Sequence, residues 1–527
     1  MVYLNRYTPA KPAALFKCRK DAVGFFSFLS NFGREVQVSL VLSLVYFLIG
    51  LVLAVYGFNL FLTAWLYWRK RNETVETPEL TQYPLVTIQL PMYNELYVAE
   101  RLIDAAAAIE WQPDRLQIQV LDDSDDETVT LAQGRVDYWC KRGINMAYSR
   151  RTDRSGFKAG ALAKGLESAT GEYIAVFDAD FVPAPDFLKK TISHFLPQPN
   201  LGMVQTRWGH LNTTYSVLTQ AEALALDGHF VVEQTARSRN GLFFNFNGTA
   251  GVWRRACIDQ AGGWQGDTLS EDLDLSYRAQ MLGWKFLFLP EVVSPAELPP
   301  QIHAFKRQQF RWAKGSTQVL LKLGPRVLGD SSLPYFKRIE GLLHLSGYMM
   351  NPLVLLALIV LVPLMAINAH TPDIMFYFTF AMFGPIILYG VSQRALYPSN
   401  WLSHFRFFGI LLLIGTGIAL NNSIAVLEAI TRRGNTFRRT PKFRVECEDD
   451  AWSAKQYALP LGWEVIGEWF LAFYAAVGVG VAWGHHLYWT LPYMALYMLS
   501  FAFVGSLSLW HARPVRSLAD FKFQIAD

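Results

Sequence analysis

The residues most suited to chemistry are carboxylates that follow apolar, strand-like runs. In "VFDADF", Asp178 and Asp180 stand two positions apart at the end of such a run, so both side chains can point the same way. Two carboxylates placed like this suit a hard divalent cation that also holds phosphate oxygens. A surface turn is the alternative, but the apolar residues on both sides of the motif favour the metal site.

Two further acidic motifs allow a chemical and a structural interpretation. "VLDDSDD" supplies Asp122 and Asp123, which could accept hydrogen bonds from a nucleobase or a ribose. The same motif starts a capping-box pattern for the next helix, with Ser124 and Glu127. "LSEDLDL" contains Asp272, a candidate general base toward a hydroxyl. Acidic residues at a helix start also favour the helix dipole, and Thr268 with Glu271 matches a capping box, so the motif alone leaves the choice open.

Two aromatic motifs could line a pocket. In "FFNFNGTAGVWRR", Gly248 would permit close backbone approach, although a tight core loop explains it equally well. In "RQQFRW", Gln308 and Arg311 are three residues apart and share one helical face. Arginine binds phosphate bidentately, and the adjacent Trp312 could stack on a sugar. An amphipathic helix with its tryptophan at the lipid headgroups is the alternative.

The composition indicates a membrane protein. Of 527 residues, 52% are hydrophobic and only 17% are charged. The net charge of +4 is too small and dispersed to argue for a nucleic-acid partner. Four scattered cysteines form no CxxC motif, which predicts isolated thiols rather than disulfides or a zinc site.

Charge-free apolar runs long enough to span a bilayer divide the chain. The predicted parts are an N-terminal segment with a transmembrane anchor at 1–70, a soluble domain at 84–325, transmembrane helices within 340–511 and a cytosolic tail at 512–527. The stretch 407–430 is apolar but leads into the basic loop 431–462. If it crossed the membrane, that loop would change sides, so the positive-inside rule predicts an interfacial helix.

The soluble region alternates strand-like and helix-like runs. "YPLVTIQLP", "LQIQVLDDS" and "EYIAVFDADF" are β-rich, and amphipathic helical runs separate them. This alternation predicts an α/β fold with a parallel sheet and helices on both faces. Ligands of such sheets bind beyond the carboxyl ends of the strands, where the acidic motifs stand.

Taken together, "DDSDD", "DAD", "SED" and "QQFRW" resemble the D, DxD, [T/S]ED and QxxRW motifs of family 2 membrane glycosyltransferases, in the same order and at similar spacing. That family includes cellulose, hyaluronan and chitin synthases. The sequence of residues 84–325 resembles in particular the sequences of plant cellulose-synthase-like glucomannan and glucan synthases. The resemblance implies a GT-A-like, Rossmann-type nucleotide-sugar domain with a mixed, mostly parallel sheet, beside an α-helical transmembrane region.

The resemblance also implies roles for individual residues. The residues that would bind the nucleotide sugar are Tyr93, Glu95, Asp122 or Asp123, Lys158, Asp178, Gln308 and Arg311. Asp180 and Asp178 would hold Mg²⁺ or Mn²⁺, and Asp272 would be the catalytic base. The acceptor would lie against Trp312, Asn247, Gly248 and Glu271. Cellulose synthases carry a gating loop near the position of "TFRRTPKFRV", but the sequence of this segment differs from the usual sequence of that loop.

These roles predict an inverting, metal-dependent hexosyltransferase that uses UDP-glucose or GDP-mannose. The favoured acceptor is a growing β-linked polysaccharide, made processively and passed through the membrane segments. A non-processive synthase that glycosylates a membrane lipid is the enzyme alternative. A transporter that has lost its enzyme is the third, and the intact carboxylate set argues against it. We expect a multi-pass membrane protein with a cytosolic catalytic domain, in the plasma (inner) membrane if the source is bacterial.

Overall fold

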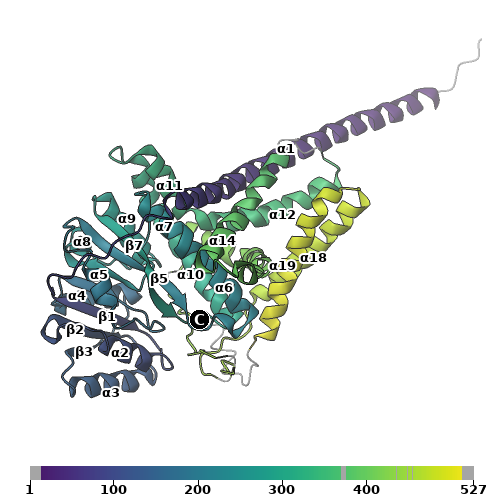
Figure 1. Ribbon diagram of the computed structural model, residues 1–527. Helices are drawn as coiled ribbons and strands as arrows, with labels where there is room; N and C mark the ends of the chain where they lie inside the picture. Colours follow the sequence, from purple (N-terminus) through teal and green to yellow (C-terminus); the bar gives the residue numbers. More distant parts are fainter. Residues whose placement is uncertain (1–12, 370–374, 435, 448, 454, 513–527) are drawn as a thin grey trace, which may run out of the picture.

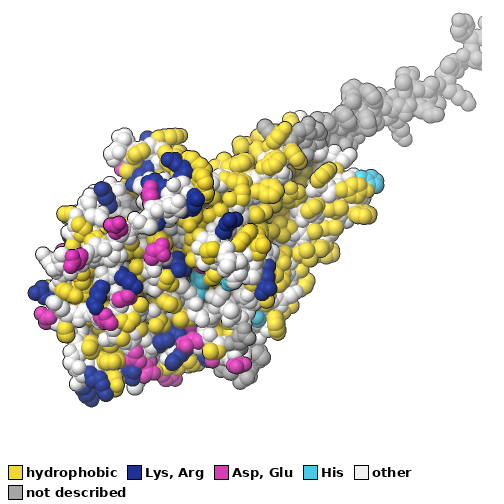
Figure 2. Space-filling model, viewed as in Figure 1, with side chains coloured by type: hydrophobic (Ala, Val, Ile, Leu, Met, Phe, Trp, Pro, Cys, Tyr) yellow, Lys and Arg dark blue, Asp and Glu magenta, His cyan; other side chains and the backbone are white. Residues whose placement is uncertain are grey.

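The computed structural model describes residues 13–369, 375–434, 436–447, 449–453 and 455–512. The predicted tail at 512–527 lies almost wholly outside these residues, as does the beginning of the N-terminal segment. Figure 1 shows an α/β domain beside a set of long helices, with α1 (Ala13–Lys70) running along the helical part. Figure 2 shows charged side chains spread over the α/β domain and a mostly hydrophobic surface over the long helices.

A seven-stranded sheet forms the centre of the α/β domain, in the order β3-β2-β1-β4-β6-β5-β7. The strands are β1 (Val86–Met92), β2 (Leu116–Asp122), β3 (Met146–Arg150), β4 (Tyr173–Val176), β5 (Leu201–His210), β6 (Gly251–Arg254) and β7 (Lys285–Ala296). β6 runs antiparallel to β4 and β5, whereas β1 pairs in parallel with β2 and β4, β2 with β3, and β5 with β7. The predicted mixed, mostly parallel sheet is confirmed.

Helices cover both faces of the sheet because successive strand residues point to opposite sides. In β4, Tyr173 and Ala175 belong to one hydrophobic core, while Ile174 and Val176 belong to another. The first core includes α2 (Ala99–Ala107), α3 (Thr128–Cys140) and α5 (Phe187–Ile192). The second includes α4 (Phe157–Ser168), α8 (Arg255–Gln260) and α9 (Glu271–Met281). The strand ends that carry the acidic motifs are thereby fixed between two packed layers.

In the described part of the chain, five helices are long and apolar enough to cross a bilayer. They occupy Gln37–Lys70, Gly347–Ala366, Met375–Leu396, Glu464–Gly484 and Tyr488–Trp510, and include α12 (Met350–Ala366), α14 (Phe383–Leu396), α18 (Glu464–Gly484) and α19 (Leu491–Trp510). The chain is therefore a multi-pass membrane protein. Trp401–Gly417 and Ala419–Ile430 form an apolar pair bent by 43°, where an interfacial helix stays a prediction.

Helix α10 (Ile302–Gly329) joins the two parts of the molecule. Its buried Lys306 forms an ion pair with Glu468 of α18 and donates a hydrogen bond to Ser508 Oγ of α19, at 2.7 Å. His303 Nε2 lies 2.9 Å from the carbonyl oxygen of Ser508. These contacts fix the helix that carries the "QQFRW" motif against two membrane helices.

Helices occupy most of the chain between β5 and the loop that leads into β6. The elements are α6 (Val217–Asp227), the π-helix η3 (Gly228–Gln234) and α7 (Thr235–Arg239). They form one continuous helical run that contacts α14 through its middle turn. Helix α11 (Tyr335–Leu345) then links α10 to α12.

Candidate active site

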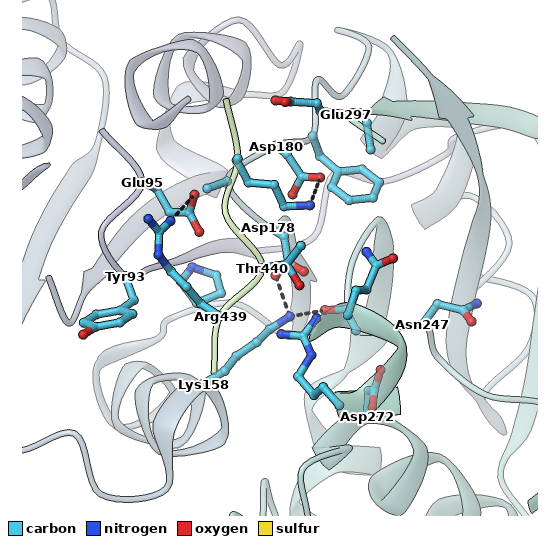
Figure 3. Close-up of a pocket in the computed structure, with 18 of the residues that line it drawn as sticks. Tyr93, Glu95, Lys158, Asp178, Asp180, Asn247, Asp272, Glu297, Arg439 and Thr440 are labelled. Carbon is cyan, nitrogen blue, oxygen red and sulfur yellow. Dashed lines mark hydrogen bonds and ion pairs between the residues drawn. The ribbon is translucent and has the colours of Figure 1, made fainter. Parts of the chain in front are cut away.

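The carboxyl ends of β1, β2 and β4 open into one pocket, which α9, α10 and the segment after the membrane helix pair also line. The predicted site residues in this pocket are Tyr93, Glu95, Asp123, Lys158, Asp178, Asp180, Asn247, Gly248, Glu271, Asp272, Gln308, Arg311 and Trp312. Figure 3 shows Tyr93 and Glu95 on one side and Asn247 and Asp272 on the other, with Lys158 and Asp178 between them. Motifs far apart in the sequence therefore share one cleft.

Asp122 does not line the pocket, unlike its neighbour Asp123. Its carboxylate accepts hydrogen bonds from the backbone N–H of Ser124 and the hydroxyl of Tyr148, both at 2.8 Å. Of the two candidates for base or ribose binding, the structure brings only Asp123 to the pocket. Arg151 holds that carboxylate through two hydrogen bonds, one of them 2.9 Å long.

The capping-box interpretation of the two acidic motifs is wrong. Helix α3 begins at Thr128 with no side-chain cap, and Ser124 Oγ instead accepts the backbone N–H of Asn94 at 2.7 Å. Helix α9 likewise has no side-chain hydrogen bond from its N-cap, Ser270. Acidic side chains of both motifs make other local contacts instead: Asp126 Oδ1 accepts the backbone N–H of Thr128 at 2.9 Å, and Asp272 Oδ1 accepts that of Leu273 at 2.8 Å.

An aromatic and basic group lies at the end of the pocket that Tyr93 lines. The guanidinium of Arg154 lies 3.2 Å from the ring centroid of Tyr93, and Phe157 also lines the pocket. Sequence reasoning missed Arg154 and Phe157, although Phe157 directly precedes the predicted site residue Lys158. A flat cation and two rings provide stacking surfaces for a planar base.

Lysines neutralise both aspartates of the "DAD" motif. Lys158 Nζ donates to Asp178 Oδ1 at 2.5 Å and to the Gly248 carbonyl at 2.9 Å. Burial alone would lower the pKa of Lys158, but the nearby Asp178 and Glu271 carboxylates raise it overall. Lys442 Nζ donates to Asp180 Oδ2 at 2.7 Å. At this edge of the sheet, both aspartate carboxylates therefore already bind cationic side chains.

Asp178 and Asp180 fit a divalent metal ion bound together with a diphosphate. Magnesium usually takes one or two carboxylates from a protein and completes its octahedral shell with phosphate oxygens and water. Among the described residues, no group of three or more histidine, cysteine or acidic side chains is arranged as a complete metal site. The protein would therefore supply two ligands, and the diphosphate would supply others.

Asp272 combines burial with a nearby like charge. Burial and the Glu271 carboxylate raise the pKa of Asp272 to about 7 from its ordinary 3.8, and Lys158 opposes this rise. Its neighbour Gly248 has φ +81°, and a Cβ added there would lie 3.0 Å from Asp272 Oδ2. A carboxyl group that titrates near neutral pH is well suited to general-base catalysis.

The basic segment (residues 436–447), which follows the bent helix pair, also enters the pocket. Arg439 forms an ion pair with Glu95 at 3.2 Å, and Arg311 lies over the ring of Phe437 at 5.0 Å. Burial raises the pKa of Glu95 to about 7, although Arg439 and Lys442 act against it. The sequence singled out this segment only through its likeness to a loop of cellulose synthases.

Glu297, which follows β7, is a pocket residue that sequence reasoning missed. Its carboxylate accepts the backbone N–H groups of Phe443 and Arg444, at 3.0 and 2.8 Å. The side chain thereby fixes the basic segment at the sheet edge. A single glutamate in "SPAELPP" carries no pattern that could have revealed this contact.

The residues that form the sheet and most of the pocket match a known family model. The model described as "Glycosyltransferase like family 2" matches residues 84–315. We call residues 84–315 the glycosyltransferase domain after this match. This glycosyltransferase domain contains the whole sheet and every predicted site residue, and the basic segment reaches it from outside.

Curated relatives match the glycosyltransferase domain rather than the whole chain. "Probable glucomannan 4-beta-mannosyltransferase 7" of Oryza sativa subsp. japonica is 45% identical over 261 residues, which are 49% of this chain and 45% of that protein. "Glucomannan 4-beta-mannosyltransferase 2" of Arabidopsis thaliana is 40% identical over 286 residues, 52% of this chain and 54% of that protein. The chain thus matches about half the length of these relatives.

A solved structure supports the fold. A mannosyltransferase from Pyrobaculum calidifontis, determined in complex with GDP-Man and Mn²⁺, superposes with a TM-score of 0.52. The superposition covers 73% of this chain and 99% of that one, at 20% sequence identity. At this identity the likeness concerns the GT-A-like fold, and it confirms the predicted fold class.

Proposed function

We propose that this protein transfers a mannosyl group from GDP-mannose to a growing β-linked glycan, with inversion at the anomeric carbon. The observation that carries the proposal is the position of Asp272 in a pocket shared with the "DAD" carboxylates, Arg311 and Trp312. The plant relatives are named as glucomannan mannosyltransferases, which favours mannose over the glucose alternative. The donor would otherwise be UDP-glucose.

The reaction would use the two ends of the pocket for two substrates. The base would lie near Tyr93 and Asp123, and the diphosphate would lie against the side chains at the centre. Asp272 would remove the proton from an acceptor hydroxyl, whose oxygen attacks the anomeric carbon from the face opposite the diphosphate. The bond from this carbon to the diphosphate breaks, so an α-linked donor gives a β-linked product.

Cationic side chains would stabilise the departing diphosphate. Lys158, Arg311 and the amide of Gln308 all line the pocket, where they could donate hydrogen bonds to its oxygens. Mg²⁺ or Mn²⁺ held by Asp178 and Asp180 would neutralise further negative charge on the leaving group. Trp312 would provide a flat surface for the acceptor sugar.

A polysaccharide acceptor is favoured because the pocket adjoins the membrane helices. Helix α10 carries Gln308, Arg311 and Trp312 and contacts α19 and the bent helix pair. A product released beside Trp312 could pass directly into the membrane region, so we propose processive synthesis with coupled translocation. Transfer to a membrane lipid is the alternative. The basic residues that flank the spans favour a cytosolic position for the glycosyltransferase domain.

The test is incubation of membranes that contain the full chain with labelled GDP-mannose or UDP-glucose and Mn²⁺ or Mg²⁺. We expect label from GDP-mannose in an ethanol-insoluble polymer that β-mannanase degrades. Label found only in chloroform-soluble lipid would refute the polymer proposal. Asp272→Asn should abolish transfer but retain donor binding, and loss of donor binding in this variant would count against Asp272 as the base.

A further inference from the structure

Asn247 carries a buried hydrogen-bond donor that is left over beside Asp272. Its backbone N–H donates to Gln205 Oε1 at 3.0 Å, and its Oδ1 accepts from Asn245 Nδ2 at 2.9 Å. Within the described structure, its Nδ2 is buried and makes no hydrogen bond. An unsatisfied buried donor is costly, and proteins retain one mainly where a ligand or another function uses it.

A histidine fixes the direction of this amide. His229 Nε2 lies 3.1 Å from Asn247 Oδ1, and His229 Nδ1 lies 2.9 Å from Glu233 Oε2. Both ring nitrogens face oxygen atoms, so Asn247 Oδ1 accepts from Asn245 Nδ2 and, in the tautomer that carries its proton on Nε2, from His229. With its oxygen held in this way, the amide must point its NH₂ group in the remaining direction.

The hydrogen bond from His229 and the nearby cationic groups offset the effect of burial on the pKa of Glu233. Burial alone would raise the pKa of Glu233, but the hydrogen bond and charge of His229, together with the charge of Arg237, lower it overall. The side chains of His229 and Glu233 nevertheless keep 28% and 30% of their surface accessible. The pair thus borders on open space rather than being enclosed in the core.

The pair lies on a π-helical turn that is wedged against the membrane region. His229 and Glu233 belong to η3, and π-helical turns are often found at functional sites. A Cβ added to Gly228 would lie 2.4 Å from the ring of Tyr389 in α14, so this turn packs directly on a membrane helix. The histidine that contacts the amide of Asn247 therefore lies on a turn in direct contact with a membrane helix.

We propose that Asn247 Nδ2 donates a hydrogen bond to a hydroxyl of the acceptor sugar, and that His229 and Glu233 are positioning residues that hold this amide. This inference rests on the proposed function, because it assumes that the acceptor hydroxyl lies at Asp272. A pyranose has several neighbouring hydroxyls, so one could be deprotonated by Asp272 while another accepts from Asn247. The ligand class is a β-linked hexose at the end of a glycan.

The test compares His229→Ala, Asn247→Ala and the double variant in the full-length protein. Two rates are measured with GDP-mannose: transfer to a β-linked mannooligosaccharide, and hydrolysis, in which water replaces the acceptor. We expect each single variant to lose about 10-fold in kcat/KM for the oligosaccharide, as removal of a buried hydrogen bond predicts. The ratio of transfer to hydrolysis should fall about 10-fold, because hydrolysis uses no acceptor sugar.

The double variant separates positioning from direct contact. If His229 acts only through Asn247, the double variant should be no worse than Asn247→Ala alone. Additive losses, or an equal fall in hydrolysis and transfer, would overturn the inference. His194→Ala is the matched control, since His194 is another buried histidine and does not line the pocket. We expect it to leave the ratio of transfer to hydrolysis unaltered.

Oligosaccharide binding without donor keeps this test independent of the proposed donor. Titration of the detergent-solubilised protein with the mannooligosaccharide should show a Kd about 10-fold higher in both single variants. Equal Kd values in wild type and variants would overturn the inference. Absence of any turnover of GDP-mannose by the wild-type protein would instead refute the proposed function.

Discussion

The titration of Asp272 predicts how the reaction depends on pH. If Asp272 is the general base, it works only as a carboxylate, so activity must fall as pH drops through its pKa. With a pKa of about 7, about nine-tenths of the group is ionised at pH 8 and about one-tenth at pH 6. We therefore expect kcat/KM to fall about 10-fold between pH 8 and pH 6.

The substitution Glu271→Gln tests the cause of this pKa. Glu271 is the second largest contribution after burial, and it raises the pKa of Asp272. Two like charges near each other at an effective dielectric constant of about 20 interact by roughly 1–2 kcal/mol, which moves a pKa by about one unit. The acid limb of the variant should therefore lie about one pH unit lower, with about half of the maximal activity retained near pH 6.

The assay is initial-rate transfer from pH 5 to pH 9 at constant ionic strength. Glu167→Gln serves as the control, because Glu167 is an exposed acid outside the pocket and should leave the profile unchanged. The pKa of Glu95 is also about 7, but only the limb that belongs to Asp272 should move in Glu271→Gln. The assignment of Asp272 as the base would be refuted if activity stayed constant down to pH 5. It would also be refuted if the acid limb of the profile had the same midpoint in Glu271→Gln as in the wild type.

Three further substitutions test other contacts. Lys442→Ala removes the ion pair of 2.7 Å that Lys442 forms with the carboxylate of Asp180. Mn²⁺ should therefore bind the donor-free protein about 10-fold more tightly in isothermal titration. An unchanged Mn²⁺ affinity would contradict the idea that Lys442 and the metal share Asp180. Lys306→Met leaves Glu468 buried without its partner and should cost about 3–5 kcal/mol, whereas the double variant Lys306→Met/Glu468→Leu should recover most of this loss in thermal unfolding. Additive losses would contradict the ion pair. Gly228→Ala places a Cβ 2.4 Å from an aromatic ring of α14 and should cost about 1–3 kcal/mol, so an unchanged Tm would refute the close packing.

The sequence predicted the sheet and the residues that end its strands because both have local causes. Apolar runs such as "VTIQL" alternate with helical runs, and Asp178 and Asp180 follow their strand directly. Parallel strands bring their carboxyl ends to one edge, which gathers such residues without any further information. The antiparallel strand β6 had no comparable local signal, since its four residues come after a loop rather than a crossover helix.

Contacts between distant segments could not be predicted in the same way. Lys442 follows Asp180 by 262 residues, and Glu297 contacts a segment 146 residues away. No periodicity or motif spacing in the sequence predicts either contact. Each depends on how the later part of the chain returns to the edge of the sheet. The choice between Asp122 and Asp123 was open for a similar reason, since Tyr148 decides it from a neighbouring strand.

The sequence by itself determined the family, the α/β domain, the membrane helices and the set of carboxylates, because these follow from short motifs and hydrophobic patterns. The tertiary structure alone decided the environment of those carboxylates. The pKa of Asp272 depends on its burial beside Glu271 and Lys158, and the orientation of Asn247 depends on a histidine from a π-helical turn. Desolvation and hydrogen-bond direction are properties of the packed molecule, and no local stretch of residues contains them.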